Sequence, residues 1–242
     1  MKIISLVLVF VFSISFSGYP LSITDVHKEY LYGNYEEAIG IAKDLCESDE
    51  ALYYLGLSYI KIGDYPKART SLRRLTRRFS DSLFYEPGIV KLADTYFLEK
   101  DYSKAKELYF EIEQRSSSGN FLPAVLLRLA QIASRQGKWD QKTKYIKRIK
   151  SKYSRSSEMK FVKVLEDLGD FFTIQVGAFS VRKNALLLVE ELNDEHSSYI
   201  VKEKKGNYLL YKVRVGRFKS RYDAEKVSSK LLNDGYPARI YP

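Results

Sequence analysis

Two short stretches near the C-terminal end of the chain set polar and cationic side chains at alternate positions. They read FTIQVGAF at 172–179 and YKVRVGRF at 211–218, so that Gln175 in the first corresponds to Arg214 in the second, two residues after Lys212. Lysine and arginine make charge-assisted hydrogen bonds with anionic groups, and a glutamine amide donates and accepts hydrogen bonds at once. The chemistry that this pattern indicates is the binding of a polar, anionic ligand.

The residues offer little for catalysis. The chain has two histidines, His27 and His196, and it contains neither an HxxxH pair nor a GxSxG motif. Glu190 and Glu191 are neighbours in a predicted helix, so their carboxyls diverge, whereas those of a glycosidase converge on one bond. We therefore predict that the protein is not an enzyme and uses no catalytic residue, metal ion or cofactor.

A strand–turn–helix unit must position the polar side chains, and the chain repeats this unit at an offset of 39 residues. Polar and apolar residues alternate in both stretches, which indicates strands with one buried face. Gly177 and Gly216 are expected to end these strands, where a Cβ would obstruct the chain. A helix follows each strand, and closing strands are expected at 198–203 and 237–241. The resulting order is βαββαβ, the ferredoxin-like plan.

In this plan both helices cover one face of an antiparallel sheet, and the other face meets solvent or a ligand. Parity assigns the apolar residues of both stretches to the helix-covered face. It assigns these residues to the open face: Thr173, Gln175, Tyr208, Leu210, Lys212, Arg214, Arg239 and Tyr241. The buried half of the pattern recurs because the plan is pseudo-symmetric, while the two strands give the open face different polar groups.

Residues 171–242, with the motif IQVGAF and its second copy, resemble a SPOR domain. The resemblance implies binding to bacterial peptidoglycan, with a preference for glycan strands without stem peptides, which are concentrated at the division septum. The family binds glycan on the open sheet face, and its glutamine matches Gln175. Several members have an aromatic residue where Leu210 stands, so Tyr208 would have to supply stacking on a sugar. We predict these glycan-binding residues: Thr173, Gln175, Tyr208, Leu210, Lys212, Arg214 and Arg239.

The charge of this segment agrees with a glycan ligand. Glycan without stem peptides has a free carboxylate on each muramic sugar, with which Lys212, Arg214 and Arg239 can pair. Residues 171–242 contain 13 Lys and Arg against 8 Asp and Glu, which is half of the chain's formal charge of +10. The alternative is an RNA-binding module on the same fold. Such modules place aromatic residues on the third strand, whereas 212–215 reads KVRV, so we predict no nucleic acid partner.

The middle of the chain contains a helical repeat. Four segments share a turn signature at spacings of 30, 37 and 37 residues: GNYEEA from 33, GDYPKA from 63, KDYSKA from 100 and GKWDQK from 137. A period in the thirties is typical of a solenoid of helix pairs. Residues 22–168 resemble the tetratricopeptide repeat, in which a small residue such as Gly56 lets the partner helix approach. In the fourth segment Lys142 replaces the expected Ala and Trp139 the expected Tyr, as in a half-exposed terminal cap.

The tetratricopeptide resemblance implies that the repeats hold an unidentified protein partner, and a rigid spacer without a ligand is the alternative. The predicted fold class is α+β: an all-α tetratricopeptide-type helical solenoid followed by a C-terminal ferredoxin-like βαββαβ domain. The predicted function is to bind peptidoglycan and to scaffold the partner in cell division or wall remodelling.

The first residues of the chain indicate export. One lysine precedes an apolar run at 3–16, and Ser15 and Ser17 have the spacing found before a signal-peptidase cut. We therefore predict a signal peptide over 1–17, since a membrane span needs about 20 apolar residues. An uncleaved anchor is the alternative, and only then would the protein contact the membrane. We expect a periplasmic or cell-envelope location, enriched at the septum, and we expect the single cysteine, Cys46, to be a small core residue.

Overall fold

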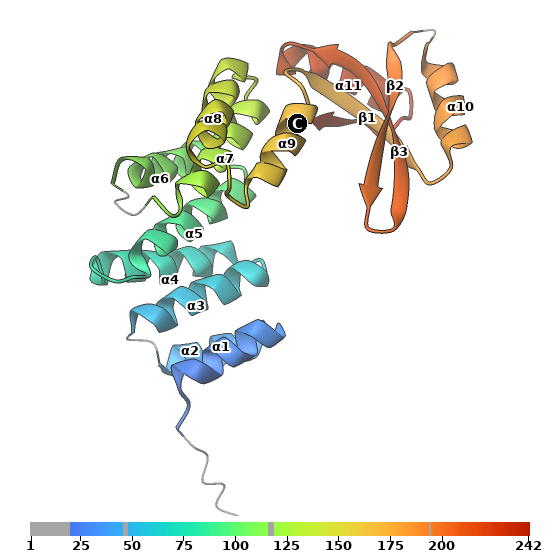
Figure 1. Cartoon of the computed structure of the whole chain (residues 1–242). Coiled ribbons are helices and arrows are strands. Elements are labelled where there is room, and N and C mark those ends of the chain that lie inside the picture. Colours follow the sequence, from blue (N-terminus) through green and yellow to red (C-terminus); the bar gives the residue numbers. More distant parts are fainter. Residues whose placement is uncertain (1–19, 46–47, 116–118, 194) are drawn as a thin grey trace, which may run out of the picture. The chain divides into compact units, whose positions relative to one another are not determined.

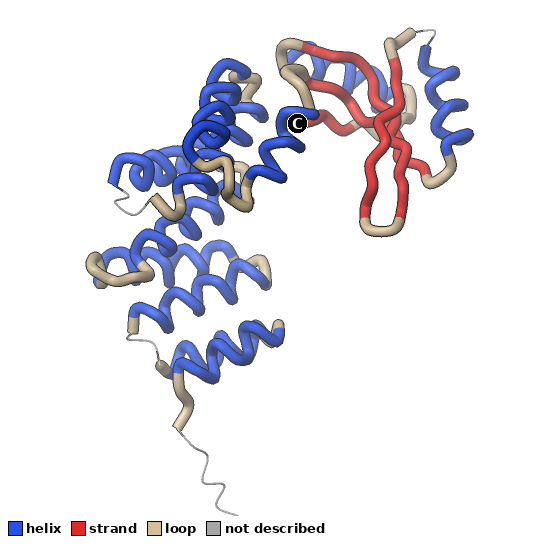
Figure 2. Tube along the Cα trace, viewed as in Figure 1, coloured by secondary structure: helices blue, strands red, loops and turns tan. Residues whose placement is uncertain are grey.

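The computed structural model describes residues 20–45, 48–115, 119–193 and 195–242 (Figures 1 and 2). The predicted signal peptide and Cys46 lie outside these described residues. Contacts between residues divide the chain into two compact units, Met1–Lys91 and Leu92–Pro242. None of the described helices is both long enough and apolar enough to cross a lipid bilayer.

The first unit is helical in its described part. Its helices are α1 (Ile23–Tyr32), α2 (Tyr35–Asp44), α3 (Asp49–Lys61), α4 (Tyr65–Arg78) and the first half of α5 (Tyr85–Leu98). α3 begins where the hydroxyl of its N-cap, Ser48, accepts a hydrogen bond from the amide of Ala51 at 3.0 Å. Gly56 of α3 faces α4, because a Cβ there would lie 2.7 Å from the Leu72 side chain. The small residue therefore lets the two helices pack closely, as the sequence predicts.

The second unit contains the later helical repeats and the sheet. After the end of α5, its repeat helices are α6 (Tyr102–Arg115), α7 (Leu122–Arg135), α8 (Trp139–Lys152) and α9 (Met159–Asp167). Tyr109 of α6 is buried, and its hydroxyl donates a hydrogen bond to Asp94 Oδ1 of α5 at 2.6 Å. Burial, with the carboxylate of Asp94 beside it, raises the pKa of Tyr109 far above its ordinary value, so the hydroxyl remains a donor. Arg128 of α7 donates to the same oxygen at 3.1 Å, and this network joins the three helices.

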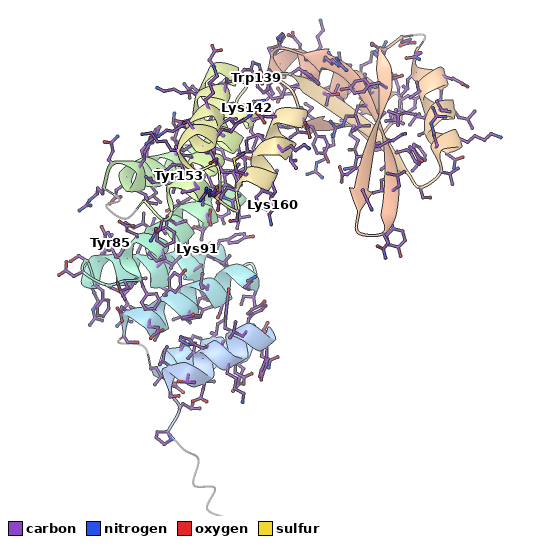
Figure 3. The ribbon with its side chains drawn as sticks, in the orientation of Figure 1. Tyr85, Lys91, Trp139, Lys142, Tyr153 and Lys160 are labelled. Carbon is purple, nitrogen blue, oxygen red and sulfur yellow. The ribbon has the colours of Figure 1, made fainter. Side chains whose placement is uncertain are left out.

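The prediction that Lys142 belongs to a half-exposed terminal cap is wrong. α9 packs against α7 and α8, and Lys142 is only 3% exposed. Its ammonium lies between α8 and α9 (Figure 3), 2.8 Å from the carbonyl oxygen of Gly169 and 2.5 Å from Asp170 Oδ1. The last carbonyls of a helix have no partner within it, and the lysine supplies donors at the end of α9.

Trp139 stands where the other repeat turns have a tyrosine, and it packs against the start of the sheet (Figure 3). The centroid of its ring lies 5.1 Å from that of Phe172. Its indole N–H donates a hydrogen bond to the carbonyl oxygen of Lys219 at 3.4 Å. A Cβ at the neighbouring Gly137 would lie 3.0 Å from the Phe172 ring. Within this unit, these contacts attach the end of the repeats to the sheet.

The sheet domain has the predicted order βαββαβ (Figure 1). Its elements are β1 (Phe172–Phe179), α10 (Arg182–Asn193), β2 (Ser198–Lys205), β3 (Tyr208–Phe218), α11 (Arg221–Asn233) and β4 (Arg239–Tyr241). The strands are antiparallel to their neighbours in the order β2-β3-β1-β4. α10 and α11 share a core with Ile174, Val176, Val213 and Val215 on one face. The predicted α+β class, a helical solenoid followed by a ferredoxin-like domain, is confirmed.

The prediction that Gly177 and Gly216 end their strands is wrong, because β1 continues to Phe179 and β3 to Phe218. Both glycines lie instead where the register between β1 and β3 shifts. On β3 one extra residue lies opposite the start of β1, which is a β-bulge. Gly216 has a φ of +69°, and a Cβ there would lie 2.3 Å from the Phe218 ring. This position therefore requires glycine both for its backbone conformation and for space.

We expect Gly216→Ala to lower the free energy of unfolding by about 1–2 kcal/mol, because alanine is strained at this φ and its Cβ displaces the Phe218 ring. Chemical denaturation of the chain measures the loss. Gly206→Ala is the control, since Gly206 also has a positive φ, +60°, but has nothing within 4 Å of the Cβ position. Equal losses in the two variants would contradict a steric contribution from the Phe218 ring.

Candidate functional site

Arg214 lies in the middle of the open face, the sheet face opposite the core shared with α10 and α11. In the strand register it pairs with Gln175 on β1 and with Tyr199 on β2. Arg239 on β4 pairs with the other side of Gln175. Arg214 is only 7% exposed, and its guanidinium lies 5.3 Å from the centroid of the Tyr241 ring. Side chains of the neighbouring strands thus enclose a cationic group on this face.

Arg214 and Gln175 have hydrogen-bonding capacity that the described residues do not use. The Nε atom of Arg214 and the Oε1 atom of Gln175 are buried, and neither finds a hydrogen-bond partner in the described part of the chain. Buried polar atoms in native proteins nearly always have a partner, and an unpaired one costs about 1–3 kcal/mol. These two atoms lie on residues paired across β1 and β3, which makes the middle of the open face the candidate position for a polar ligand.

Tyr241 orients two arginines on the β4 side of the open face. The guanidinium of Arg214 lies 5.3 Å from the centroid of its ring, and that of Arg239 lies 5.2 Å from it. A cation–π contact of this kind restrains the plane of a guanidinium, whose N–H groups are arranged to pair with a carboxylate in a bidentate way. The β4 side of the face is therefore suited to a carboxylate ligand.

Arg217 and Tyr199 also lie on the open face, although the sequence pattern did not predict them. The guanidinium of Arg217 lies 5.1 Å from the centroid of the Tyr199 ring and 5.2 Å from that of Phe171. Simple parity assigns Arg217 to the helix-covered face, but the bulge beside Gly216 inserts a residue and moves it to the open face. The available signal was Gly216 itself, since a glycine inside a strand pattern often marks a bulge.

Thr173 is buried, and its hydroxyl is already hydrogen-bonded. The residue is only 2% exposed, and its Oγ1 hydroxyl donates a hydrogen bond to the carbonyl oxygen of Val215 at 3.2 Å. The Oγ1 atom of Thr173 also accepts a hydrogen bond from the hydroxyl of Tyr199 at 3.0 Å. Thr173 therefore positions Tyr199 and has no free donor for a ligand.

Three predicted residues lie farther along β3 from Arg214. The ammonium of Lys212 lies 2.5 Å from Glu203 Oε2, so a carboxylate of the neighbouring strand already pairs with it. Leu210 and Tyr208 precede Arg214 by four and six residues, which corresponds to about 14 and about 20 Å along a strand. Tyr208 is 77% exposed and pairs with Lys205 beside the turn that joins β2 to β3. These two residues are therefore outside the cluster around Arg214.

The predicted residues that the structure brings together are Gln175, Arg214 and Arg239, with Thr173 in a supporting position. Among the residues that the structure describes, no group of three or more His, Cys, Asp or Glu side chains could hold a metal ion. The chain has a helical-repeat solenoid, followed by a small α+β domain whose open sheet face is rich in arginine. These features define the class of protein: a repeat protein with a C-terminal ligand-binding domain.

Comparison with protein families identifies the particular domains. Residues 168–239 match the SPOR domain, and residues 50–82 and 124–156 match the tetratricopeptide repeat. The chain therefore has a C-terminal SPOR domain preceded by tetratricopeptide repeats, which confirms both resemblances found in the sequence. A SPOR domain implies peptidoglycan binding, and tetratricopeptide repeats imply a scaffold for protein interactions. Both families consist of non-catalytic binding domains.

Several solved structures are similar to the chain at low identity. PilF of Pseudomonas aeruginosa is 18% identical with a TM-score of 0.46, and the match covers 58% of this chain and 64% of that one, less than two thirds of its length. MamA from strain AMB-1 is 16% identical with a TM-score of 0.46, covering 71% and 88% of the two chains. MamA from strain MSR-1 is 17% identical with a TM-score of 0.45, covering 71% and 92%. No curated protein gives a significant match.

Proposed function

We propose that the protein is a non-enzymatic cell-envelope protein that binds peptidoglycan glycan strands on the open face of its SPOR domain and holds a protein partner on its repeats. The preferred ligand is glycan without stem peptides, as found at the division septum, and the process is cell division or wall remodelling. Export follows from the predicted signal peptide at 1–17. The observation that supports glycan binding best is the pair of buried, unused hydrogen-bonding atoms on Arg214 and Gln175.

Polar groups of the open face can pair with groups of a stripped glycan strand, that is, a strand without stem peptides. The guanidiniums of Arg214 and Arg239 suit the carboxylates of muramic sugars through charge-assisted hydrogen bonds. The amide of Gln175 suits an N-acetyl group, because both groups donate and accept. Lys212 adds a further cation once a ligand carboxylate replaces Glu203. We propose that Leu210 and Tyr208 extend the same surface along β3, while Thr173 supports it from within.

Co-sedimentation with purified sacculi tests this function. Amidase treatment removes the stem peptides and leaves a free carboxylate on each muramic sugar. We expect several-fold more protein to sediment with treated than with untreated sacculi, and we expect added salt to release it, because the new partners are charged. Equal sedimentation with both would contradict the preference for stripped strands, and sedimentation with neither would contradict peptidoglycan binding. Competition by single-stranded RNA, but not by soluble stripped glycan, would favour the RNA-binding alternative.

A further inference from the structure

A cationic groove lies beside β4, the edge strand of the sheet. It has a volume of about 780 Å³, and all its lining residues belong to the unit Leu92–Pro242. They come from α11, from β4 at the edge of the sheet, from the turns that follow α5 and α7, and from the adjoining ends of α6 and α7. In the described part of the chain, no Asp or Glu side chain lines the groove, whereas five exposed basic side chains do: Lys100, Arg135, Lys138, Arg221 and Arg239. Arg221 already pairs with Glu225 at 2.8 Å, which leaves the other four as the cations for a ligand. A cleft lined by charge of one sign concentrates ligands of the opposite sign.

Lys100 occupies a backbone position that favours glycine. Its φ is +66°, and the corresponding residues of the other three repeat turns are Gly33, Gly63 and Gly137, which all have positive φ. A lysine in this conformation is strained. The residue therefore lowers stability and contributes a cation to the groove, and strained backbone positions of this kind are concentrated at functional sites.

The groove is continuous with the open face. Arg239 and Tyr241 line it, and the ring of Tyr241 also contacts the guanidinium of Arg214 on the open face. Arg214, Gln175 and Arg239 lie on three successive strands in register, so they span about 10 Å across the sheet. An extended polymer that crosses the strands at these residues reaches the β4 edge and enters the groove.

We propose that this groove is the second part of the glycan-binding site, in which the repeats contribute Lys100, Arg135 and Lys138 to further carboxylates of the same strand. This inference rests on the proposed function. A glycan strand suits the groove because its carboxylates recur along one chain, so several cations are engaged at once. The repeats thereby lengthen the binding surface, and long strands bind more tightly than short ones because the later contacts are intramolecular.

A charge-removing double variant, Lys100→Gly with Lys138→Gln, tests the groove in the whole chain. The glycine relieves the strain at position 100, so the unfolding midpoint is expected to equal or exceed that of the wild type. We expect the variant to bind long stripped strands about tenfold more weakly and a stripped tetrasaccharide with unchanged affinity. Lys144→Gln with Lys163→Gln is the matched control, since both lysines are exposed on α8 and α9 and do not line the groove.

The possible results separate the groove from the proposed function. If the wild type binds both glycans and the groove variant binds long strands as tightly as the wild type does, the role of the groove in glycan binding is overturned and the proposed function stands. If the wild type binds neither glycan, both are overturned. A poly-glutamate peptide is the probe for an acidic protein segment as the ligand of the groove. If this peptide binds the wild type but not the groove variant, and if long glycan does not displace it, the groove binds an acidic protein segment and its role in glycan binding is overturned.

Discussion

A Gln175→Ala, Arg214→Ala double variant is expected to bind amidase-treated sacculi about a hundredfold more weakly than the wild-type chain. Hydrogen bonds to a charged group contribute about 1.5–3 kcal/mol each and those between neutral groups about 0.5–1.5 kcal/mol. The two side chains together therefore contribute about 2–4.5 kcal/mol, and a hundredfold change in affinity corresponds to about 2.7 kcal/mol. A sedimentation titration over a range of sacculus concentrations measures the change.

Two further variants make this result interpretable. Arg182→Ala is the matched control, because Arg182 is an exposed arginine in the first turn of α10, which packs on the opposite face of the sheet. It is expected to bind as the wild type does. Arg239→Ala provides a second test if the double variant does not fold, since Arg239 is exposed, and we expect it to bind about tenfold more weakly. Wild-type sedimentation of a folded double variant would contradict the proposed site.

The faces of the sheet were predictable from local pattern as long as the strands were regular. Side chains alternate along a strand with a period of two, which was enough to place Ile174 and Val213 in the core and Gln175 and Arg214 on the opposite face. The pattern failed beyond Gly216, because a bulge adds one residue and reverses the parity that follows. The repeat turns were predictable for the same reason, since their signature is local to each turn.

Burial on the open face was not predictable from the same pattern. Thr173 and Arg214 were assigned to an open surface, yet both are buried. Tyr199 of β2 covers Thr173 through a hydrogen bond. Tyr241 of β4 covers Arg214 through a cation–π contact. Such contacts depend on which residues face one another across strands. The pattern of a single strand does not contain this register.

Lys142→Ala restores the residue expected at this position of a tetratricopeptide repeat, yet we expect it to lower the free energy of unfolding by about 3 kcal/mol. The gain in helix propensity is at most a few tenths of a kcal/mol. The loss is larger, because the carbonyl oxygens of Leu165 and Gly169 lose a buried donor. An unpaired buried acceptor costs about 1–3 kcal/mol, and breaking a buried ion pair costs about 3–5 kcal/mol. The half-exposed Asp170 reduces the second cost, because water can reach its carboxylate.

Lys150→Ala on the same helix is the matched control, since Lys150 pairs with Glu166 at the surface at 3.0 Å, and surface pairs contribute about 0–1 kcal/mol. Chemical denaturation of both variants measures the difference, and a Lys142→Ala loss no larger than the control's would contradict the capping role. Lys142 holds the carbonyl of Gly169 three residues before β1 begins. Its loss is therefore expected to loosen the attachment of the repeats to the sheet, which would abolish the preference for long glycan strands while tetrasaccharide binding persists. Lys142, which departs from the repeat signature as Trp139 does, would then help to couple the repeats to the open face.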